Sequence, residues 1–167
     1  MFRLGMNKRG TAMALDGLTL ANIQAFIGCE LGVSEWQTLD QRRIDQFAEC
    51  TGDHQWIHVD RERAGRESPF GTTIAHGYLT LSLLAQTTNE IVVEPLGLSH
   101  ALNYGLDRTR FLAPVKAGSR VRNRIKLISA ESKGEGRTLL TTENQVEIEG
   151  ELRPALVAHA LVMAITE

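Results

Sequence analysis

The chain has 167 residues, of which 43% are hydrophobic and 23% are charged. These values are ordinary for a soluble globular protein, and the length corresponds most simply to one domain. The formal net charge of −2 argues against a general nucleic-acid binder, because such proteins carry a clear basic excess.

The sequence predicts a cytoplasmic protein without a membrane span. It has no run of about 18 apolar residues, and its N-terminus lacks the hydrophobic segment of a signal peptide. Cys29 and Cys50 have no metal-type spacing and are expected to be reduced thiols. We expect residues 1–15 to form a flexible tail and residues 16–167 to form a single domain.

Three elements are predicted in the first part of this domain. Residues 17–28 fit a short helix or turn, and residues 32–39 fit a strand. Residues 40–52 are predicted to form a helix, because Asp40 is a good N-cap, apolar side chains share one face and Gly52 suits a helix stop.

The most hydrophobic helical segment follows a loop at residues 66–77. In residues 77–93, Leu79, Leu83 and Leu84 recur at helical spacing, and other apolar residues fall on further sides. A helix that is apolar on several faces is buried. We therefore expect this helix to be enclosed by other elements.

Four later segments are predicted as strands of one antiparallel sheet. Residues 100–115 alternate in part between apolar and polar side chains, whereas 118–130 and 137–150 alternate clearly, with a glycine-containing hairpin between them. Residues 154–166 are apolar on both faces, which is typical of a central strand, although a buried helix also fits. This order predicts an α+β fold in which the sheet wraps around the buried helix.

The two alternating segments carry opposite charges on one face. The first has a basic stripe formed by Arg120, Arg122, Arg124 and Lys126, and the second has Glu143, Glu147 and Glu149. If these segments pair, the charges meet across the ladder, where each opposite pair contributes about 0.2–1 kcal/mol. We expect a self-complementary sheet face, with a stripe that meets the phosphates of a ligand as the alternative.

The segment ECTGDHQWIHVDRERAG, residues 49–65, concentrates reactive side chains. Asp53 and His58 lie in a predicted loop, where they can point at one spot and work as a carboxylate–imidazole pair that adds or removes water. The alternative is ordinary turn chemistry for Asp53 and a surface position for His58. A metal site at His54, His58 and Asp60 is a weaker alternative, because no distant further ligand is evident.

A second segment adds a candidate oxyanion site. His76 and Gly77 directly precede the buried helix, whose first N–H groups have no partners within the helix. Together with the helix dipole, these groups can stabilise a developing negative charge. An ordinary helix entry is the alternative.

The stretch FAECTGDHQWIHVDRERAGRESPFGTTIAHGYLTLSLL resembles the MaoC-like dehydratases, the (R)-specific enoyl-CoA hydratases of the hot-dog fold, and most of all their nodulation-protein-N-like branch. The signature of that family is Asp, any residue, Asn-Pro, any residue and His, with His-Gly downstream at the start of the central helix. Asp53 and His58 match the catalytic pair, and His76 and Gly77 match the helix entry.

The chain also departs from the family pattern. Gln55 and Trp56 replace the Asn-Pro pair; Gln55 retains an amide with a longer reach, and Trp56 has packing as its simplest role. Some hydratases carry a small hydroxyl residue one to two turns into the central helix. Because the matching positions here are Leu84 and Ala85, with Ser82 nearby, that role is not transferred.

The resemblance implies a hot-dog domain, a sheet wrapped around a long helix, that pairs into a homodimer. It implies a hydro-lyase that reversibly hydrates trans-2-enoyl-CoA to (R)-3-hydroxyacyl-CoA, with no metal and no redox cofactor. Water lies between Asp53 and His58 and adds to C3, while the N–H of Gly77 holds the thioester oxygen. His76 and Gln55 are assigned to substrate binding at the same place.

The implied partner is a small acyl-CoA, whose phosphates could meet Arg108, Arg110 or Lys116. Neither a nucleic acid nor a membrane is expected as a partner. An acyl-CoA thioesterase on the same fold is one alternative, because Glu90 is a carboxylate on the central helix. A non-catalytic acyl-CoA-binding protein is the other, with the replacement of Asn-Pro as the feature that favours it.

Overall fold

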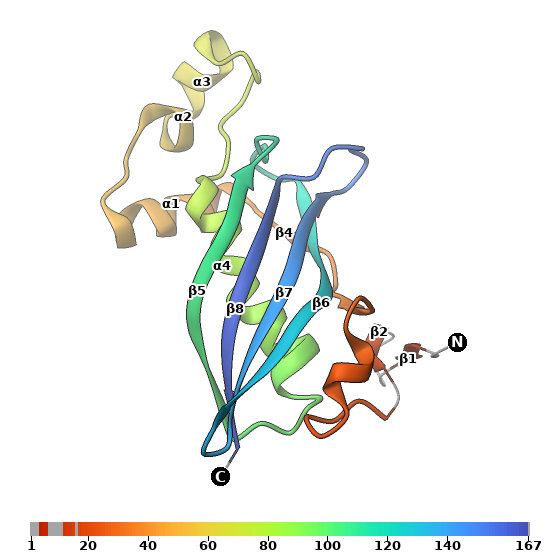
Figure 1. Cartoon of the computed structure of the whole chain (residues 1–167). Helices are drawn as coiled ribbons and strands as arrows, with labels where there is room; N and C mark the ends of the chain where they lie inside the picture. The colour runs from red at the N-terminus through yellow and green to blue at the C-terminus, as the bar shows by residue number, and fades with distance from the viewer. Residues whose placement is uncertain (1–3, 7–11, 16, 167) are drawn as a thin grey trace.

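The computed structural model describes residues 4–6, 12–15 and 17–166, and it is built on one antiparallel sheet curled around one helix (Figure 1). The strand order is β3-β6-β7-β8-β5, and β4 also pairs with β6. The strands are β3 (Glu30–Val33), β4 (Gln37–Thr38), β5 (His100–Phe111), β6 (Arg120–Gly134), β7 (Arg137–Ile148) and β8 (Leu156–Ile165). The predicted α+β architecture is confirmed, and the segment at 154–166 forms a strand rather than a helix.

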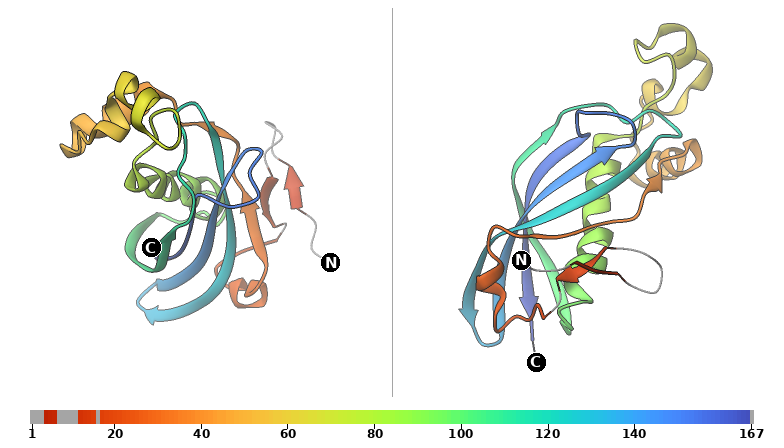
Figure 2. Two further views of the ribbon diagram at one scale, coloured as in Figure 1. Left: turned by 90° about the horizontal axis from the view of Figure 1, so that it is seen from above. Right: turned by 90° about the vertical axis from the view of Figure 1, so that its right-hand side faces the viewer.

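Helix α4 (Gly77–Thr88) lies in the concave side of the sheet (Figure 2), and a π-helical segment, η2 (Asn89–Val93), continues it. Leu79, Leu83 and Leu84 are buried, as their spacing predicts. No helix in the described ranges is long and apolar enough to cross a membrane.

Three further helices, α1 (Gln41–Thr51), α2 (Trp56–Val59) and α3 (Arg61–Glu67), gather near the first turn of α4 (Figure 1). Helix α1 confirms the prediction for residues 40–52. The prediction of a loop around His58 is wrong, because the chain forms α2 and α3 there. The 17–28 segment contains one 3₁₀ turn, η1 (Ile23–Phe26).

Two apolar clusters fill the space between α4, η2 and the sheet, and a polar belt lies among them. In this belt the Asn123 side-chain amide donates to Thr87 Oγ1 and to Asn144 Oδ1, each over 2.9 Å. Buried polar groups need such partners, so this contact favours one position of α4 over the sheet.

The outer face of β6 and β7 carries the charge pairs predicted from the sequence. Glu147 accepts from Arg122 over 2.6 Å and from Arg124 over 2.9 Å, and Arg120 pairs with Glu149 over 2.7 Å. These arginines are therefore engaged by carboxylates, and the self-complementary sheet face is confirmed. The alternative of a phosphate-binding stripe has no support here.

Strand β5 forms an edge of the sheet and is exposed on both faces. Leu102, Tyr104 and Leu106 are large apolar side chains that stay about half exposed or more. The sequence predicts the strand but gives no sign of this exposure, because alternation normally reports a covered face.

Within the predicted flexible tail, β1 (Leu4–Met6) and β2 (Ala12–Leu15) pair as an antiparallel hairpin. The remaining residues of this tail lie outside the described residues. The division into a tail and a single domain stays a prediction.

Candidate active site

The end of α1 places Asp53. Gly52 adopts a left-handed conformation with φ of 78°, and its N–H donates to the Ala48 carbonyl over 2.8 Å, which ends the helix and turns the chain. Asp53 follows in an exposed turn, where its carboxylate accepts the Gln55 N–H over 3.4 Å. Its backbone is thus set by the helix cap, while its side chain stays accessible.

Helix α2 carries His58 into a buried position, with 6% of the residue exposed. Its Nδ1 lies 2.7 Å from the Ile74 carbonyl oxygen. A carbonyl only accepts, so Nδ1 carries the hydrogen and Nε2 keeps a free lone pair. The backbone is held as well, since Gln41 Nε2 donates to the His58 carbonyl over 2.7 Å.

A short bridge brings the second segment to the same place. Ile74 pairs with Lys116, and the Ala75 N–H donates to the Val115 carbonyl over 2.7 Å. The chain then enters α4, with His76 as its N-cap residue and Gly77 as its first residue.

His76 turns back toward the catalytic candidates. Its Nε2 lies 2.9 Å from the backbone oxygen of Asp53, and its ring stacks on that of His58 with centroids 3.8 Å apart. One nitrogen or oxygen atom from each of Asp53, His58 and His76 lies within 4.8 Å of the others. The predicted Asp53–His58 convergence is therefore present, and a single bridging water fits such a separation.

A cavity of about 260 Å³ opens beside this cluster. His58, Gly77 and Thr80 line one side of it, and the segment from Phe111 to Val115 lines the other. An imidazole and the amino end of a buried helix thus face one space, which suits acid–base work on a group that gains negative charge.

Electrostatics favour the neutral form of His58. Burial lowers its pKa below the usual 6.5, and His76 lowers it further, while the Ile74 carbonyl and the Asp53 carboxylate oppose part of this shift. Near pH 7 the ring is a base with an available lone pair.

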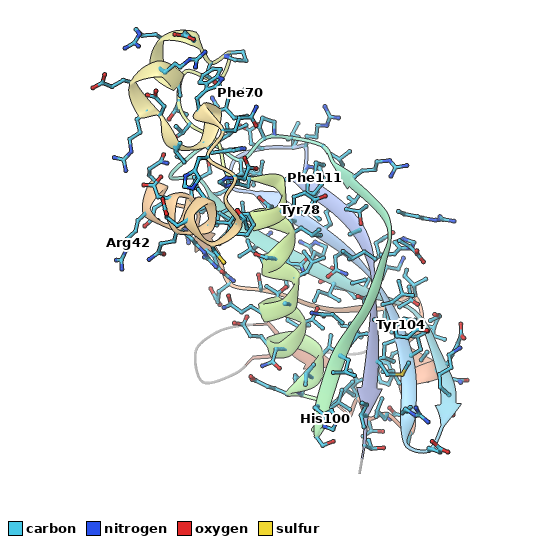
Figure 3. All side chains as sticks on the ribbon, turned by 90° about the vertical axis from the view of Figure 1, so that its left-hand side faces the viewer. Arg42, Phe70, Tyr78, His100, Tyr104 and Phe111 are labelled. Atoms are coloured by element: carbon cyan, nitrogen blue, oxygen red, sulfur yellow. The ribbon has the colours of Figure 1, made fainter. Side chains whose placement is uncertain are left out.

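Gly77 has a close neighbour that explains why it lacks a side chain. A Cβ on Gly77 would lie 3.1 Å from two ring atoms of Phe111. Phe111 also meets Tyr78 edge-on, with centroids 6.0 Å apart, at the first turn of α4 (Figure 3). The absence of a side chain at Gly77 thus gives the Phe111 ring room to pack against the start of α4.

The other predicted residues lie around this site. Gln55 is exposed and is the N-cap residue of α2. Arg108 has a positive φ of 51° at a register shift of β5, and Arg110 follows it. Arg110 and Lys116, both exposed, flank the cavity-lining segment in sequence.

The metal alternative based on His54, His58 and Asp60 has no geometric support. His54 lies 3.7 Å from Glu49, and Asp60 caps α3 by accepting the Arg63 N–H. A different trio, Asp53 with His58 and His76, has ligand-type atoms close together. Stacked imidazole rings do not converge their in-plane lone pairs on one ion, so this trio is a poor cage.

Sequence reasoning missed three contributors to the site: Gln41, the Ile74 carbonyl and Phe111. A glutamine in the first turn of a helix is typical of a solvated position, and a backbone carbonyl leaves no trace in the residue type. Only Phe111 has a signal in the sequence, because it begins a Phe-x-x-Pro-Val segment, residues 111–115, that resembles the strand region of the family.

The chain is similar to several known proteins. The family model described as MaoC like domain matches residues 22–149. Nodulation protein N of Rhizobium leguminosarum bv. viciae is 54% identical over 142 residues, covering 85% of this chain and 88% of that protein. 3-Hydroxyacyl-thioester dehydratase Z of Mycobacterium tuberculosis is 46% identical over 144 residues, covering 86% of this chain and 94% of that protein.

Among solved structures, the unliganded R-hydratase PhaJ1 from Pseudomonas aeruginosa superimposes with a TM-score of 0.67. It covers 84% of this chain and 83% of its own, at 23% sequence identity. The hot-dog fold predicted from the sequence is thereby confirmed.

Proposed function

Because the chain belongs to the MaoC-like dehydratase family, we propose that it reversibly adds water to a trans-2-enoyl-CoA and yields an (R)-3-hydroxyacyl-CoA. The observation that carries this proposal is the convergence of Asp53 and His58 beside a cavity that the first residue of α4 also lines. The relative named 3-hydroxyacyl-thioester dehydratase Z supports the same class of reaction.

The free lone pair of His58 suggests how the proton moves. A water held between the two side chains donates one O–H to the Asp53 carboxylate and the other to His58 Nε2. As the water oxygen bonds to C3, His58 takes its proton and the C2–C3 electron pair moves toward the thioester. The imidazolium then returns this proton to C2, so hydrogen and hydroxyl add overall and the pair is reset.

The negative charge that develops on the thioester oxygen needs a donor. The N–H of Gly77 is at the first position of α4, where the helix offers unpaired donors and the positive end of its dipole. One such donor contributes about 2.7–4 kcal/mol to transition-state stabilisation in enzymes where it has been measured.

The CoA moiety is proposed to lie toward Arg110 and Lys116, with Arg108 as a further candidate. All three are exposed, and the first two flank the segment that lines the cavity. A guanidinium and an ammonium are well suited to phosphates.

The acyl tail is proposed to follow the groove between α4 and β5. This cavity of about 370 Å³ is lined mainly by apolar side chains, and it extends along the helix from Tyr78 to Thr88. Ten helical residues span about 15 Å, which leaves room for an extended acyl chain. Ala85 and Leu81 lie along its helical wall.

A homodimer that pairs through β5 is part of the proposal. This 12-residue edge strand has exposed apolar side chains, and such edges are normally covered or paired. Antiparallel pairing of two copies obeys the twofold symmetry of most dimers. Light scattering should give the dimer mass, and Tyr104→Glu should shift it to the monomer.

The thioesterase alternative gains nothing from the structure. Glu90 lies thirteen residues after Gly77, or about 20 Å along the helix, and it is exposed and accepts a hydrogen bond from Gln86. A carboxylate at that distance does not reach a thioester held at Gly77.

Hydration assays across acyl lengths, starting with crotonyl-CoA, test the proposed function. Loss of enoyl absorbance with formation of the (R)-3-hydroxy product, identified by chiral analysis, is expected. Release of free thiol without hydration would favour a thioesterase, and binding without turnover would favour an acyl-CoA-binding protein.

A further inference from the structure

His76 connects three parts of the site that are far apart in sequence. Its Nε2 lies 2.9 Å from the backbone oxygen of Asp53, 23 positions earlier, and its ring stacks on His58 at 3.8 Å and 28°. Its own backbone is the N-cap of the helix that begins with Gly77. One side chain thus fixes where the carboxylate, the imidazole and the oxyanion donor lie relative to one another.

The hydrogen-bond geometry defines the tautomer of His76. A carbonyl oxygen only accepts, so Nε2 carries the hydrogen and Nδ1 has the lone pair. That Nδ1 is buried and has no hydrogen-bond partner in the described part of the chain. The described residues that line the catalytic cavity include His58 and Gly77 but neither His76 nor Asp53. Asp53 is exposed, whereas His76 is only 2% exposed. The ring therefore lies behind the cavity wall rather than in contact with a ligand.

Asp53 needs an anchor of this kind. It is exposed and follows a left-handed glycine, and among the described residues its own N–H has one long contact, 3.4 Å to Thr51 Oγ1. A turn with so few contacts opens easily. The ring of Phe47 packs on His76, with centroids 5.1 Å apart, so the anchor itself is held in place.

We propose that His76 is a positioning residue, which donates Nε2–H to the Asp53 carbonyl and supports the His58 ring from behind, so that the two catalytic side chains hold one water at a fixed place beside Gly77. This role replaces the direct substrate contact expected from the sequence. It rests on the proposed hydratase function.

Two substitutions separate the donor from the ring. His76→Phe keeps a flat ring that can stack on His58, but it removes the Nε2–H donor. His76→Gln removes the ring and keeps an amide that donates at a similar reach. His54→Gln is the matched control, because His54 is a neighbouring exposed histidine that contacts Glu49 on the surface.

Two measurements are made on each full-length variant, namely crotonyl-CoA hydration kinetics and amide hydrogen exchange of residues 52–55, with the melting temperature as a check of folding. His76→Phe should lower kcat by about 10- to 100-fold with little change in KM, because the loss is one of alignment rather than binding. Exchange at residues 52–55 should speed up by about 10-fold, since the turn loses its anchor. His76→Gln should recover most of both values, because the donor to the Asp53 carbonyl contributes more to alignment than the ring behind His58. His54→Gln should match the wild type.

A wild-type kcat in His76→Phe would overturn the proposal. It would also be overturned if His76→Gln lost as much kcat as His76→Phe while hydrogen exchange stayed at the wild-type rate in both variants. If His76→Phe fails to fold, the comparison of His76→Gln with the wild type tests the proposal by the same two measurements. Values of kcat and exchange near those of the wild type would then support the donor role. If the wild type hydrates no enoyl-CoA, the proposed function fails. The exchange measurement then decides by itself whether His76 anchors Asp53.

Discussion

The rings of His58 and His76 are stacked with their centroids 3.8 Å apart, yet each ring directs a nitrogen to a different backbone carbonyl. His58 Nδ1 reaches Ile74 and His76 Nε2 reaches Asp53. Each ring is thus oriented by a main-chain acceptor that does not titrate. The arrangement leaves His58 Nε2 free to serve as a base.

Activity should fall in mild acid with an apparent pKa below 6.5. Burial lowers the pKa of His58, and the neighbouring His76 lowers it further. The hydrogen bond to the Ile74 carbonyl and the Asp53 carboxylate raise this pKa, but they offset the lowering only in part. Only the neutral ring accepts a proton from water, so kcat/KM should rise with pH through this depressed pKa and then level off. A pH–rate profile of crotonyl-CoA hydration measures it. An acid limb centred above 6.5 would contradict the assignment.

Gly77→Ala should weaken substrate binding by displacing the Phe111 ring. The added Cβ would lie 3.1 Å from the Phe111 ring, and this ring is 49% exposed, so it can move away toward the cavity. We expect KM to rise by about 10-fold, with a stability loss of no more than about 1 kcal/mol.

The double variant Gly77→Ala with Phe111→Ala is the control for this effect. It removes the colliding ring, so KM should return toward that of Phe111→Ala alone. If the double variant keeps the whole defect, then Gly77 matters for a reason other than Phe111. Steady-state kinetics on all three variants decide.

The groove between α4 and β5 should set the acyl length. Ala85→Phe places a ring on its helical wall, about eight residues beyond Gly77, or about 12 Å along the helix. Crotonyl-CoA should be hydrated as before, whereas a C8 or longer enoyl-CoA should lose about 10-fold or more in kcat/KM. Equal losses for short and long substrates would place the acyl tail elsewhere.

Glu147 should stabilise the fold without contributing to turnover. Burial raises its pKa, but hydrogen bonds from Arg122 and Arg124 outweigh this and hold it below the usual 4.5. Because the folded-state pKa is the lower one, the stabilisation is present above 4.5 and is lost as the pH falls through the depressed value.

Glu147→Gln should therefore lower the free energy of unfolding by about 1–2 kcal/mol at pH 7. Urea unfolding should show this difference shrinking as the pH falls through the depressed pKa, below which the carboxyl is protonated in both states. Hydration kinetics should be unchanged. A stability gap that stays constant with pH would mean that the loss comes from packing instead of charge.

Local signals in the sequence predicted much of the fold, because the relevant contacts are close in the chain. Asp40 and Gly52 mark both ends of α1, and the opposite charges on β6 and β7 meet as their alternation indicates. Helix α3 escaped prediction because RERAGRE contains a glycine and lacks an apolar stripe.

The site itself could be predicted only in part. Asp53, His58 and Gly77 have side chains or positions that carry chemistry, and their spacing resembles a family pattern. The hydrogen bond from His76 goes to the backbone carbonyl of Asp53, 23 positions away. Because every residue has a backbone carbonyl, the residue type gives no sign of this contact. The exposure of β5 was equally hidden, since it depends on what the rest of the chain leaves uncovered.

The central claim is that Asp53 and His58 hold and activate one water. The most direct test is kcat for crotonyl-CoA hydration by Asp53→Asn and His58→Ala, each checked for folding by its melting temperature. General acid–base catalysis contributes about 100- to 10,000-fold, so each folded variant should lose at least about 100-fold. Wild-type kcat in both folded variants would contradict the account.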